Sequence, residues 1–568
     1  MKQLSEVKQV VPAMIGGRVL AIVAVLWTAL VRVWFFLQFR QSPLFPLFAS
    51  AHDRMLYHEA AMTIANGQIW PDGAFGYMPL YPWLLGVVYA VFGPSLTAAA
   101  ALGAFADCVT VACLVILARR WGAYPLVALA AATLYAMYPL AIAYAGVTMP
   151  NSVNVMLVTM LVLILDRARL SHWQDALCVG LLGGMAALGF AGTLTLMAVY
   201  WGWQIGKGWR CQMIPWRGIA LSVLSFSCLL LPVAVHNTRA EGEFVLLTTH
   251  GGFNFYMGNH ERATGYPVRV ENFRMTARLM LEDAHAFAEQ SVGRELSQAE
   301  SSAWWAQRGR WFWRNQPGQA LALTARKLAL FWNQLDVDDL RILEQLRITD
   351  GLFRSRLWPG FVWFGLLGGM GLLFAPKAYA GRLALLTGWL SVAAFFITAR
   401  YRLTFVPLMV ALGAAGVTEW IRTTWPQRQR RLWLVPLLAV VFLPVQLPDL
   451  RPVDYHNVSV QLLAMEDPAR ALAVAEAGLA LAPDNADLHH ARGHAQAELG
   501  DFLLAAAAFG RAAELRPEHP TAQFNQALSL ARQGEICQAV AALEHRLRLR
   551  PDDLRARSLY QELREFCP

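Results

Sequence analysis

Residues 50–85 read SAHDRMLYHEAAMTIANGQIWPDGAFGYMPLYPWLL and come after the first strongly apolar segment of the chain. This stretch opens with Asp53 at the head of a short amphipathic helix, and it ends in a second helix, rich in proline and aromatic residues, that begins at Pro79. A carboxylate just beyond a first membrane span is a candidate general base, and the dipole of the helix N-terminus keeps it ionised. The alternative is that Asp53 only caps its helix.

The composition is that of an integral membrane protein. The 568 residues are too many for one ordinary domain, 56% of them are hydrophobic and 21 are Trp. The formal net charge is +9, but Lys and Arg gather in short loops between apolar segments rather than on one polar domain. We therefore interpret the basic residues as signals of membrane topology and not as a nucleic-acid site.

The apolar segments predict an all-α fold, a polytopic helical bundle over residues 1–447. A helix needs roughly 20 apolar residues to cross a hydrocarbon core of about 30 Å, and the chain offers about 11 such segments. A shorter apolar piece at 80–93 is expected to lie at the membrane interface with its aromatic residues outward. The first segment lacks a small-residue cleavage pattern, so we expect an uncleaved span. The predicted spans are 17–38, 96–118, 124–147, 149–165, 176–190, 192–206, 218–236, 358–375, 382–398, 403–421 and 432–447.

The charges between the segments predict their orientation in a bacterial inner membrane. With a cytoplasmic N-terminus every inner loop carries Lys or Arg, and the loops at about 39–95 and 237–357, together with the C-terminus, face the periplasm. The segment 176–206 is either one helix of ~46 Å or two of ~22 Å. Basic residues at both ends favour two passes, and a single pass would invert everything downstream. The inner-loop residues are Arg119, Arg120, Arg167, Arg169, Lys207, Arg210, Arg217, Lys377, Arg382, Arg422, Arg428, Arg430 and Arg431.

The large outer segment has an order of its own. It starts with a glycine-rich turn at 249–267, continues with a helix whose capping box is Ser297 and Glu300, and breaks at Pro317-Gly318 before a second amphipathic helix. Its Trp residues suit a layer at the membrane surface.

Residues 448–568 predict a separate, soluble α-solenoid. Pro483, Pro517 and Pro551 recur at a period of 34, which together with the small and bulky positions between them is the tetratricopeptide pattern. Three units, the first of them partial, are the minimum for a stacked solenoid. Cys537 and Cys567 are the two cysteines of this tail and the pair available for a disulfide.

A series of short motifs in the outer loops occurs in a characteristic order. It consists of Asp53 with Tyr57-His58, Ala60 and Gly67, PLYP at 79–82, Phe92-Gly93, GGFNFYMGN at 251–259, Lys327 with Phe331-Trp332, and ARYRLTFVP at 399–407. With these motifs the chain resembles GT-C glycosyltransferases, the polyprenyl-phosphate-sugar enzymes that include protein O-mannosyltransferases and the lipid A aminoarabinose transferase. The resemblance covers roughly residues 17–447 and implies a membrane bundle with its active site on the outer face, an isoprenoid-phosphate donor and an inverting hexosyl or pentosyl transfer.

In one place the chain departs from that family. Near the outer end of the fourth span, where such enzymes often have an acid, it has Thr148-Met149-Pro150-Asn151. The second acid is therefore expected to be missing, which leaves the choice of acceptor and any assistance by a metal open. No DxD pair, zinc spacing, Walker loop or dinucleotide fingerprint occurs. We expect no required cofactor, with a divalent metal as the alternative.

Asp53 is the predicted catalytic base, and four cations are predicted to bind the donor phosphate. Arg400 and Arg402 lie at the outer end of a span, where guanidinium groups clasp a phosphate or, alternatively, snorkel to headgroups. Lys327 reaches the phosphate or lies above headgroups. Arg32 binds the donor or pairs with Asp107 inside the membrane.

Four further polar residues are candidates for the sugar or acceptor site, namely Tyr57, His58, Asn259 and His260. For each of them a structural role is the alternative: packing for Tyr57, a satisfied loop histidine for His58 and His260, and a left-handed turn residue for Asn259.

The predicted function is transfer of a sugar from a polyprenyl phosphate to a hydroxyl of a lipid, glycan or protein on the periplasmic face. The expected partners are that donor, membrane lipid, the acceptor and a protein bound by the tetratricopeptide tail, with no nucleic acid. One rival is a multi-span lipid or glycan transporter, which predicts ionisable residues at the bilayer midplane and repeats among the spans. Another is a non-catalytic envelope scaffold that acts through its tail.

Overall fold

The structure is a computed structural model that describes residues 17–42, 45, 53–267, 273, 277–355, 357–423, 434–445, 451–519 and 521–567. Every regular element in these ranges is a helix, which confirms the predicted all-α class. The chain divides into two compact units, the first made of Met1–Arg40, Phe48–Leu340 and Ser355–Pro444, the second of Gln41–Leu47, Arg341–Arg354 and Val445–Pro568. The predicted inner-loop residues Arg428, Arg430 and Arg431 and parts of the segment 432–447 lie outside the described residues.

The first unit is built around long apolar helices. By length and composition, α2 (Gly17–Phe39), α6 (Leu96–Arg120) and α12 (Trp216–Glu241) can each cross a membrane. Helices α7 (Pro125–Ala136) and α8 (Pro139–Gly146) are bent by 55° and pass the same test only as a pair. The bend falls where Pro139 lacks an N–H to continue the helix and pushes Tyr138 into an extended conformation. The count of about 11 spans stays a prediction.

Residues 173–210 form two helices, α10 (Trp173–Gly189) and α11 (Gly192–Arg210). A Cβ atom on Gly183 would lie 2.9 Å from the side chain of Met197, so the two helices fold back on each other as a hairpin. The absence of a side chain at Gly183 is what lets them approach.

Helices α4 (Asp53–Ala65) and α5 (Leu80–Phe92) pack against each other in the first outer loop. The prediction that α5 turns its aromatic residues outward is wrong for Tyr81 and Tyr89, which are buried, whereas Val91 and Phe92 are exposed. The tyrosines face inward because α4 covers that side of α5, where His58 hydrogen-bonds to Tyr89.

The large outer segment contains α13 (Gly251–Gly258), α14 (Ala277–Val292), α15 (Gln298–Asn315) and α16 (Pro317–Leu330). The capping box of Ser297 and Glu300 is present as predicted, and the break before Pro317 separates two helices. The predicted glycine-rich turn is wrong over 251–258, where the chain is helical. Side chains on Gly252 and Gly258 would overlap the backbone of Ser302 and Phe395, so these glycines permit close packing rather than a turn.

The last part of the first unit consists of α18 (Phe361–Phe374), α19 (Tyr379–Ala393), α20 (Ala399–Leu403), α21 (Val406–Arg422) and α22 (Leu434–Val441). Helices α18 and α21 approach closely because Gly371 meets Leu412 and Gly413 meets Leu367. Small residues at such seams are typical of helix packing in membranes.

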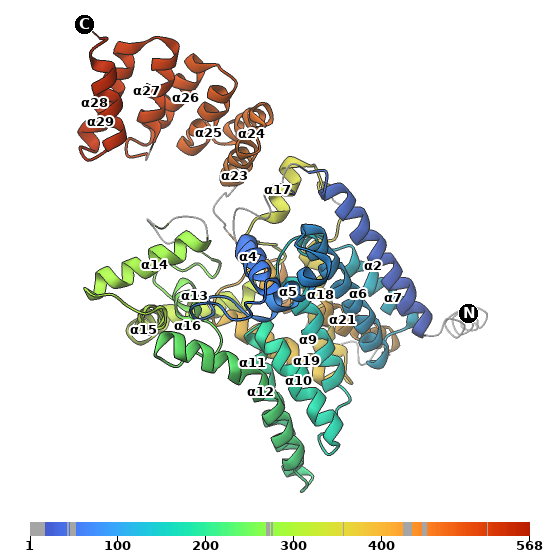
Figure 1. Ribbon diagram of the computed structural model, residues 1–568. Coiled ribbons are helices and arrows are strands. Elements are labelled where there is room, and N and C mark those ends of the chain that lie inside the picture. The colour runs from blue at the N-terminus through green and yellow to red at the C-terminus, as the bar shows by residue number, and fades with distance from the viewer. Residues whose placement is uncertain are drawn as a thin grey trace, which may run out of the picture. The chain divides into compact units, whose positions relative to one another are not determined.

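The second unit is a solenoid. It comprises α17 (Ile342–Thr349), α23 (Arg451–Ala464), α24 (Pro468–Leu481), α25 (Ala486–Glu498), α26 (Phe502–Leu515), α27 (Ala522–Gln533), α28 (Ile536–Leu549) and α29 (Leu554–Arg564). Figure 1 shows α23–α29, at the red end of the colour bar, stacked as successive antiparallel helices. Gly493 lies against Phe509, one of the predicted pairs of a small and a bulky position. The first repeat, predicted to be partial, is a complete pair of α23 and α24, because α23 reaches back into the residues after the last predicted span.

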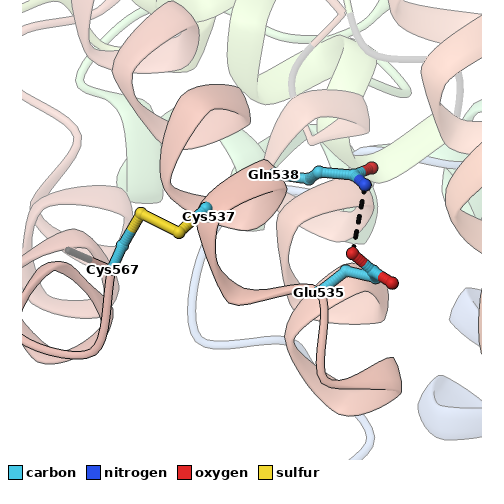
Figure 2. The surroundings of a disulfide bond; sticks show 4 residues. All are labelled: Glu535, Cys537, Gln538 and Cys567. Atoms are coloured by element: carbon cyan, nitrogen blue, oxygen red, sulfur yellow. Dashed lines mark hydrogen bonds between the residues drawn. A yellow bond between two sulfur atoms is a disulfide. The ribbon is translucent and has the colours of Figure 1, made fainter.

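A disulfide joins Cys537 at the start of α28 to Cys567 near the C-terminus (Figure 2). The bridge closes a separation of 30 residues and ties the terminal helix α29 to the repeat before it. Disulfides form in oxidising compartments and are rare in the cytosol.

Candidate active site

The site is centred on Arg400, which lies on the short helix α20 between α19 and α21. One nitrogen of its guanidinium group, Nη1, lies 3.1 Å from Oδ2 of Asp53, and the other, Nη2, lies 2.7 Å from Oδ2 of Asp339. The side chains of Arg400, Asp53 and Asp339 keep 16%, 21% and 15% of their accessible surface. The structure therefore brings together the predicted base and one predicted cation, 347 residues apart in the chain, and leaves each side chain a small exposed surface.

Three elements hold this arrangement in place. Asp53 is the first residue of α4. Asp339 accepts a hydrogen bond of 2.7 Å from Oγ1 of Thr398, and the N–H of Ala399 donates to the carbonyl of Val337. Asn151, at the start of α9 (Asn151–Leu165), donates to the carbonyl of Arg400.

Sequence reasoning missed the acids on the segment that follows α16. Tyr138 donates to Asp336 at 2.6 Å, and Tyr144 donates to Asp338 at 2.7 Å. Together with Asp339 they place three carboxylates on the segment 334–341, whereas the outer end of the fourth predicted span has no acid, in line with its sequence Thr148-Met149-Pro150-Asn151. The available signal was the run DVDD shortly after Phe331-Trp332, since three acids in four residues beside a membrane segment need cationic partners.

The charges of the site are balanced by neighbouring groups. Burial opposes the charge of Arg400, but the carboxylates of Asp339 and Asp53 outweigh that effect and raise the pKa of Arg400 well above its ordinary value. Burial lowers the pKa of Arg54, which follows Asp53 on α4, to about 9, against the opposing effects of Tyr144, Asp338 and Asp53. Both arginines are therefore cationic at neutral pH.

Two further polar side chains lie near Asp53. Burial lowers the pKa of His250 to about 4, although Asp53 opposes this effect, so the imidazole is neutral at pH 7. The ring lies against Gly76, where a Cβ atom would be 2.7 Å from its Cε1. Burial, followed by the charge of Asp53, raises the pKa of Tyr57, whose ring packs against Tyr77 and Tyr81. Tyr57 thus combines the predicted packing role with a place beside the predicted base. No sequence pattern indicated a role for His250.

Arg402 points away from this centre. It is buried, lies 3.7 Å above the ring of Phe361, and donates to the carbonyl of Asn333 at 2.8 Å and to the carbonyl of Leu335. Successive residues on a helix turn by about 100°, so two arginines separated by one residue point to nearly opposite sides. Of the two arginines, only Arg400 therefore lies beside Asp53, whereas Arg402 anchors the segment after α16 and also pairs with Asp336 at 3.3 Å.

Lys327 and Asn259 form a buried hydrogen-bonded centre. Nζ of Lys327 donates to Oδ1 of Asn259 at 3.2 Å and to the carbonyl of Phe395 at 2.8 Å, and Trp313 donates to the same Oδ1. Burial lowers the pKa of Lys327 to about 8. Asn259 has a φ of −141°, so it is not the left-handed residue that the turn hypothesis required. His260 stacks on the ring of Tyr256.

The remaining predicted residues make contacts elsewhere. Nδ1 of His58 lies 2.8 Å from the hydroxyl of Tyr89 on α5. Nε of Arg32 lies 2.7 Å from Oδ2 of Asp107, and both side chains are almost completely buried. Of the two roles considered for Arg32, the geometry therefore favours pairing within the bundle.

The arrangement offers a carboxylate beside a guanidinium group, and both are mostly buried with a small exposed part. Asp53 can accept a proton, and Arg400 can turn two N–H groups toward an anion. Within the described part of the chain, no group of three or more His, Cys, Asp or Glu residues is placed to hold a metal ion.

Comparison with known proteins returned no matching family model and no matching curated sequence. Among solved structures, ArnT from Cupriavidus metallidurans in the apo state is similar at 15% identity over 92% of this chain and 79% of its own length, with a TM-score of 0.38. The Archaeoglobus fulgidus oligosaccharyltransferase is similar at 11% identity over 78% of this chain and 55% of its own, with a TM-score of 0.41. Both have the GT-C fold that the sequence resembles. The TPR2AB domain of yeast Sti1 is similar at 12% identity over 50% of this chain and 98% of its own, with a TM-score of 0.19.

Proposed function

We propose that the protein is a membrane glycosyltransferase that moves a sugar from a polyprenyl-phosphate donor to a hydroxyl acceptor. The observation that carries the proposal is the position of Arg400 between Asp53 and Asp339, with part of each side chain still exposed. It places a proton acceptor and a phosphate ligand within one hydrogen bond of each other. That is the pair of groups that glycosyl transfer from a lipid phosphate requires.

In the proposed reaction Asp53 takes the proton of the acceptor hydroxyl. The hydroxyl oxygen forms a bond to the anomeric carbon of the sugar from the side opposite the phosphate, and the bond from that carbon to the phosphate oxygen breaks with its electron pair. The departing polyprenyl phosphate gains negative charge, which Arg400 stabilises through its paired N–H groups. The attack from the opposite side inverts the configuration.

Asp339 is proposed as a positioning residue. It holds Nη2 of Arg400 and is itself fixed by Thr398, so the guanidinium plane is oriented before the donor binds. Because Asp53 and Asp339 are both already paired with Arg400, we propose transfer without a divalent metal, and the effect of a chelator tests this.

The tail and the site are proposed to face the periplasm of a bacterial inner membrane. The Cys537–Cys567 disulfide supports an oxidising location for the tail, and the distribution of Lys and Arg supports the same side. The tetratricopeptide units are proposed to bind a protein, either the acceptor or a partner, since such solenoids present extended concave surfaces.

The test starts from a deletion strain, whose envelope glycans, lipids and proteins are compared with those of the parent by mass spectrometry. The missing sugar names the donor and the acceptor. Strains that carry Asp53→Asn or Arg400→Lys are then compared with one that carries Asp72→Asn. Asp72 is an exposed aspartate in the same loop and accepts a hydrogen bond from Gln68.

We expect Asp53→Asn to lower transfer by about 10²- to 10⁴-fold, the contribution of a general base. Arg400→Lys keeps the charge but loses the paired donors, so it is expected to lower transfer as well. Asp72→Asn is expected to match the parent, and a chelator to leave transfer unchanged. Full transfer by a well-expressed Asp53→Asn protein would overturn the proposal. If, in addition, deletion of the tail abolished the function of the protein in the cell, the scaffold hypothesis would replace the proposal.

A transporter is not favoured by the geometry. Arg32 and Asp107, the ionisable pair inside the spans that suggested one, neutralise each other at 2.7 Å and are almost completely buried.

A further inference from the structure

A second polar site lies in the first unit, at the other end of α9 from Arg400. It is a cavity of about 580 Å³ bordered by the end of α9, the last turns of α11 and the start of α19. Asn151 at the start of α9 touches Arg400, and Leu165 at its end lines the cavity. The 15 residues of α9 separate the two sites by roughly 22 Å along the helix, a distance approaching the thickness of a hydrocarbon core.

The cavity is positively charged. Lys207 and Arg210 from α11 and Lys377 before α19 line it, and within the described ranges none of the three forms an ion pair. Its acid, Asp166, is already engaged, because the indole N–H of Trp121 donates to it at 2.8 Å and Arg120 lies 3.9 Å away. Three cations are therefore left for an anionic ligand.

The rim of the cavity is apolar. Trp203 lines it beneath Lys207, whose Nζ lies 5.6 Å from the centre of the indole ring. On either side of Arg210 the chain exposes Trp209, Met213 and Trp216, with 79%, 80% and 58% of their surface accessible. Exposed Trp residues next to Lys and Arg are typical of protein segments at the level of lipid headgroups. Binding of a soluble anion would not require exposed Trp side chains beside the cations.

We propose that this cavity binds the phosphate-bearing headgroup of an anionic membrane lipid on the face opposite the Asp53 site. The volume suits a headgroup, the cations match a phosphate, and the aromatic rim accepts the start of the acyl chains. This site is independent of the proposed transfer reaction. A free phosphate from the cytosol would satisfy the same cations, so the experiment distinguishes the two sources.

The test measures retention of dioleoylphosphatidylglycerol by the detergent-solubilised full chain in native mass spectrometry, with the phosphatidylcholine analogue and inorganic phosphate as competitors. The triple variant Lys207→Gln, Arg210→Gln, Lys377→Gln removes the cations of the cavity. Its matched control, Arg167→Gln, Arg169→Gln, Arg217→Gln, removes as many exposed charges from the same face without altering the cavity.

A second variant pair avoids the loss of existing contacts. Gly206 lines the cavity, and a Cβ atom there would meet nothing within 4 Å. Gly206→Glu introduces a carboxylate into the cavity, whereas Gly206→Gln introduces a neutral side chain of the same shape.

We expect the wild type and the triple control variant to bind phosphatidylglycerol with the same affinity. The triple variant of the cavity is expected to bind it on the order of 10²-fold more weakly. Gly206→Glu is expected to weaken binding more than Gly206→Gln. Equal binding by the triple variant and the control would overturn the proposal. So would full displacement of the lipid by inorganic phosphate, which would identify a soluble anion, or an equal loss in both Gly206 variants, which would show that headgroup charge is not recognised.

Discussion

Breaking the ion pair between Arg32 and Asp107 is expected to destabilise the bundle strongly. The two side chains keep 2% and 1% of their surface, their charged atoms lie 2.7 Å apart, and Tyr135 and the carbonyl of Ala136 complete the cluster. Either substitution alone, Arg32→Gln or Asp107→Asn, leaves one buried charge without its partner. We expect each to cost about 3–5 kcal/mol of unfolding free energy.

The double variant is expected to cost less than either single one, because two neutral amides can hydrogen-bond where the ions did. The assay is unfolding of the purified protein in mixed micelles with increasing sodium dodecyl sulfate, followed by the helical circular dichroism signal. Transfer activity is measured in parallel. If Arg32 only pairs with Asp107, the double variant regains activity together with stability.

The reasoning would be refuted if Arg32→Gln abolished transfer, Asp107→Asn alone left transfer intact, and the double variant did not regain it. Arg32 would then act on the donor, as the alternative considered for it requires. The reasoning would also be refuted if the losses of unfolding free energy in the two single variants added up in the double variant, because the two ions would then not stabilise each other.

Other parts of the molecule give further expectations. Gly252→Ala, which forces a methyl group into the backbone of α15, is expected to cost about 1–3 kcal/mol in thermal unfolding, whereas Gly251→Ala on the same helix meets open space and is expected to be neutral. Cys537→Ser is expected to lower the stability of the tail by about 3–4 kcal/mol, from a loop of 30 residues, and Cys567 then becomes reactive to a maleimide; equal protease resistance with and without reductant would contradict this. Burial first, and then neighbouring histidines, lowers the pKa of His490 to about 3, so the folded tail stays unprotonated there while the unfolded chain takes up a proton below about 6.5. Tail stability is therefore expected to fall as pH drops below 6.5, by about 1.4 kcal/mol at pH 5.5, and His490→Gln is expected to flatten that dependence in limited proteolysis.

Local patterns in the sequence predicted the elements that depend on local physics. The period of 34 defined the tetratricopeptide helices, since α24, α26 and α28 start at 468, 502 and 536, and the capping box defined the start of α15. The glycines of 251–258 were misjudged because the same residue serves a turn and a close helix contact. Only the position of a distant neighbour, here the backbone of α15, decides between these two uses.

The candidate site was predictable in part. Asp53 and Arg400 were singled out from the resemblance and from their places at helix ends, and the structure brings them together. Asp339 and His250 were missed because their roles arise from segments distant in sequence. Arg402 was paired with Arg400 on proximity along the chain, although helix geometry turns the two apart.

The hairpin of α10 and α11 has a consequence for how the whole chain threads the bilayer. Asp53 and Arg400 are hydrogen-bonded to each other and therefore lie on one side of the membrane, and a chain returns to the side it left only after an even number of crossings. Eight apolar segments are predicted between them, and fusion of α10 with α11 into one rod would make that number odd. On the predicted path of eight crossings, the short break at Phe190 and Ala191 therefore sets the parity, and with it the side on which each later segment is predicted to emerge.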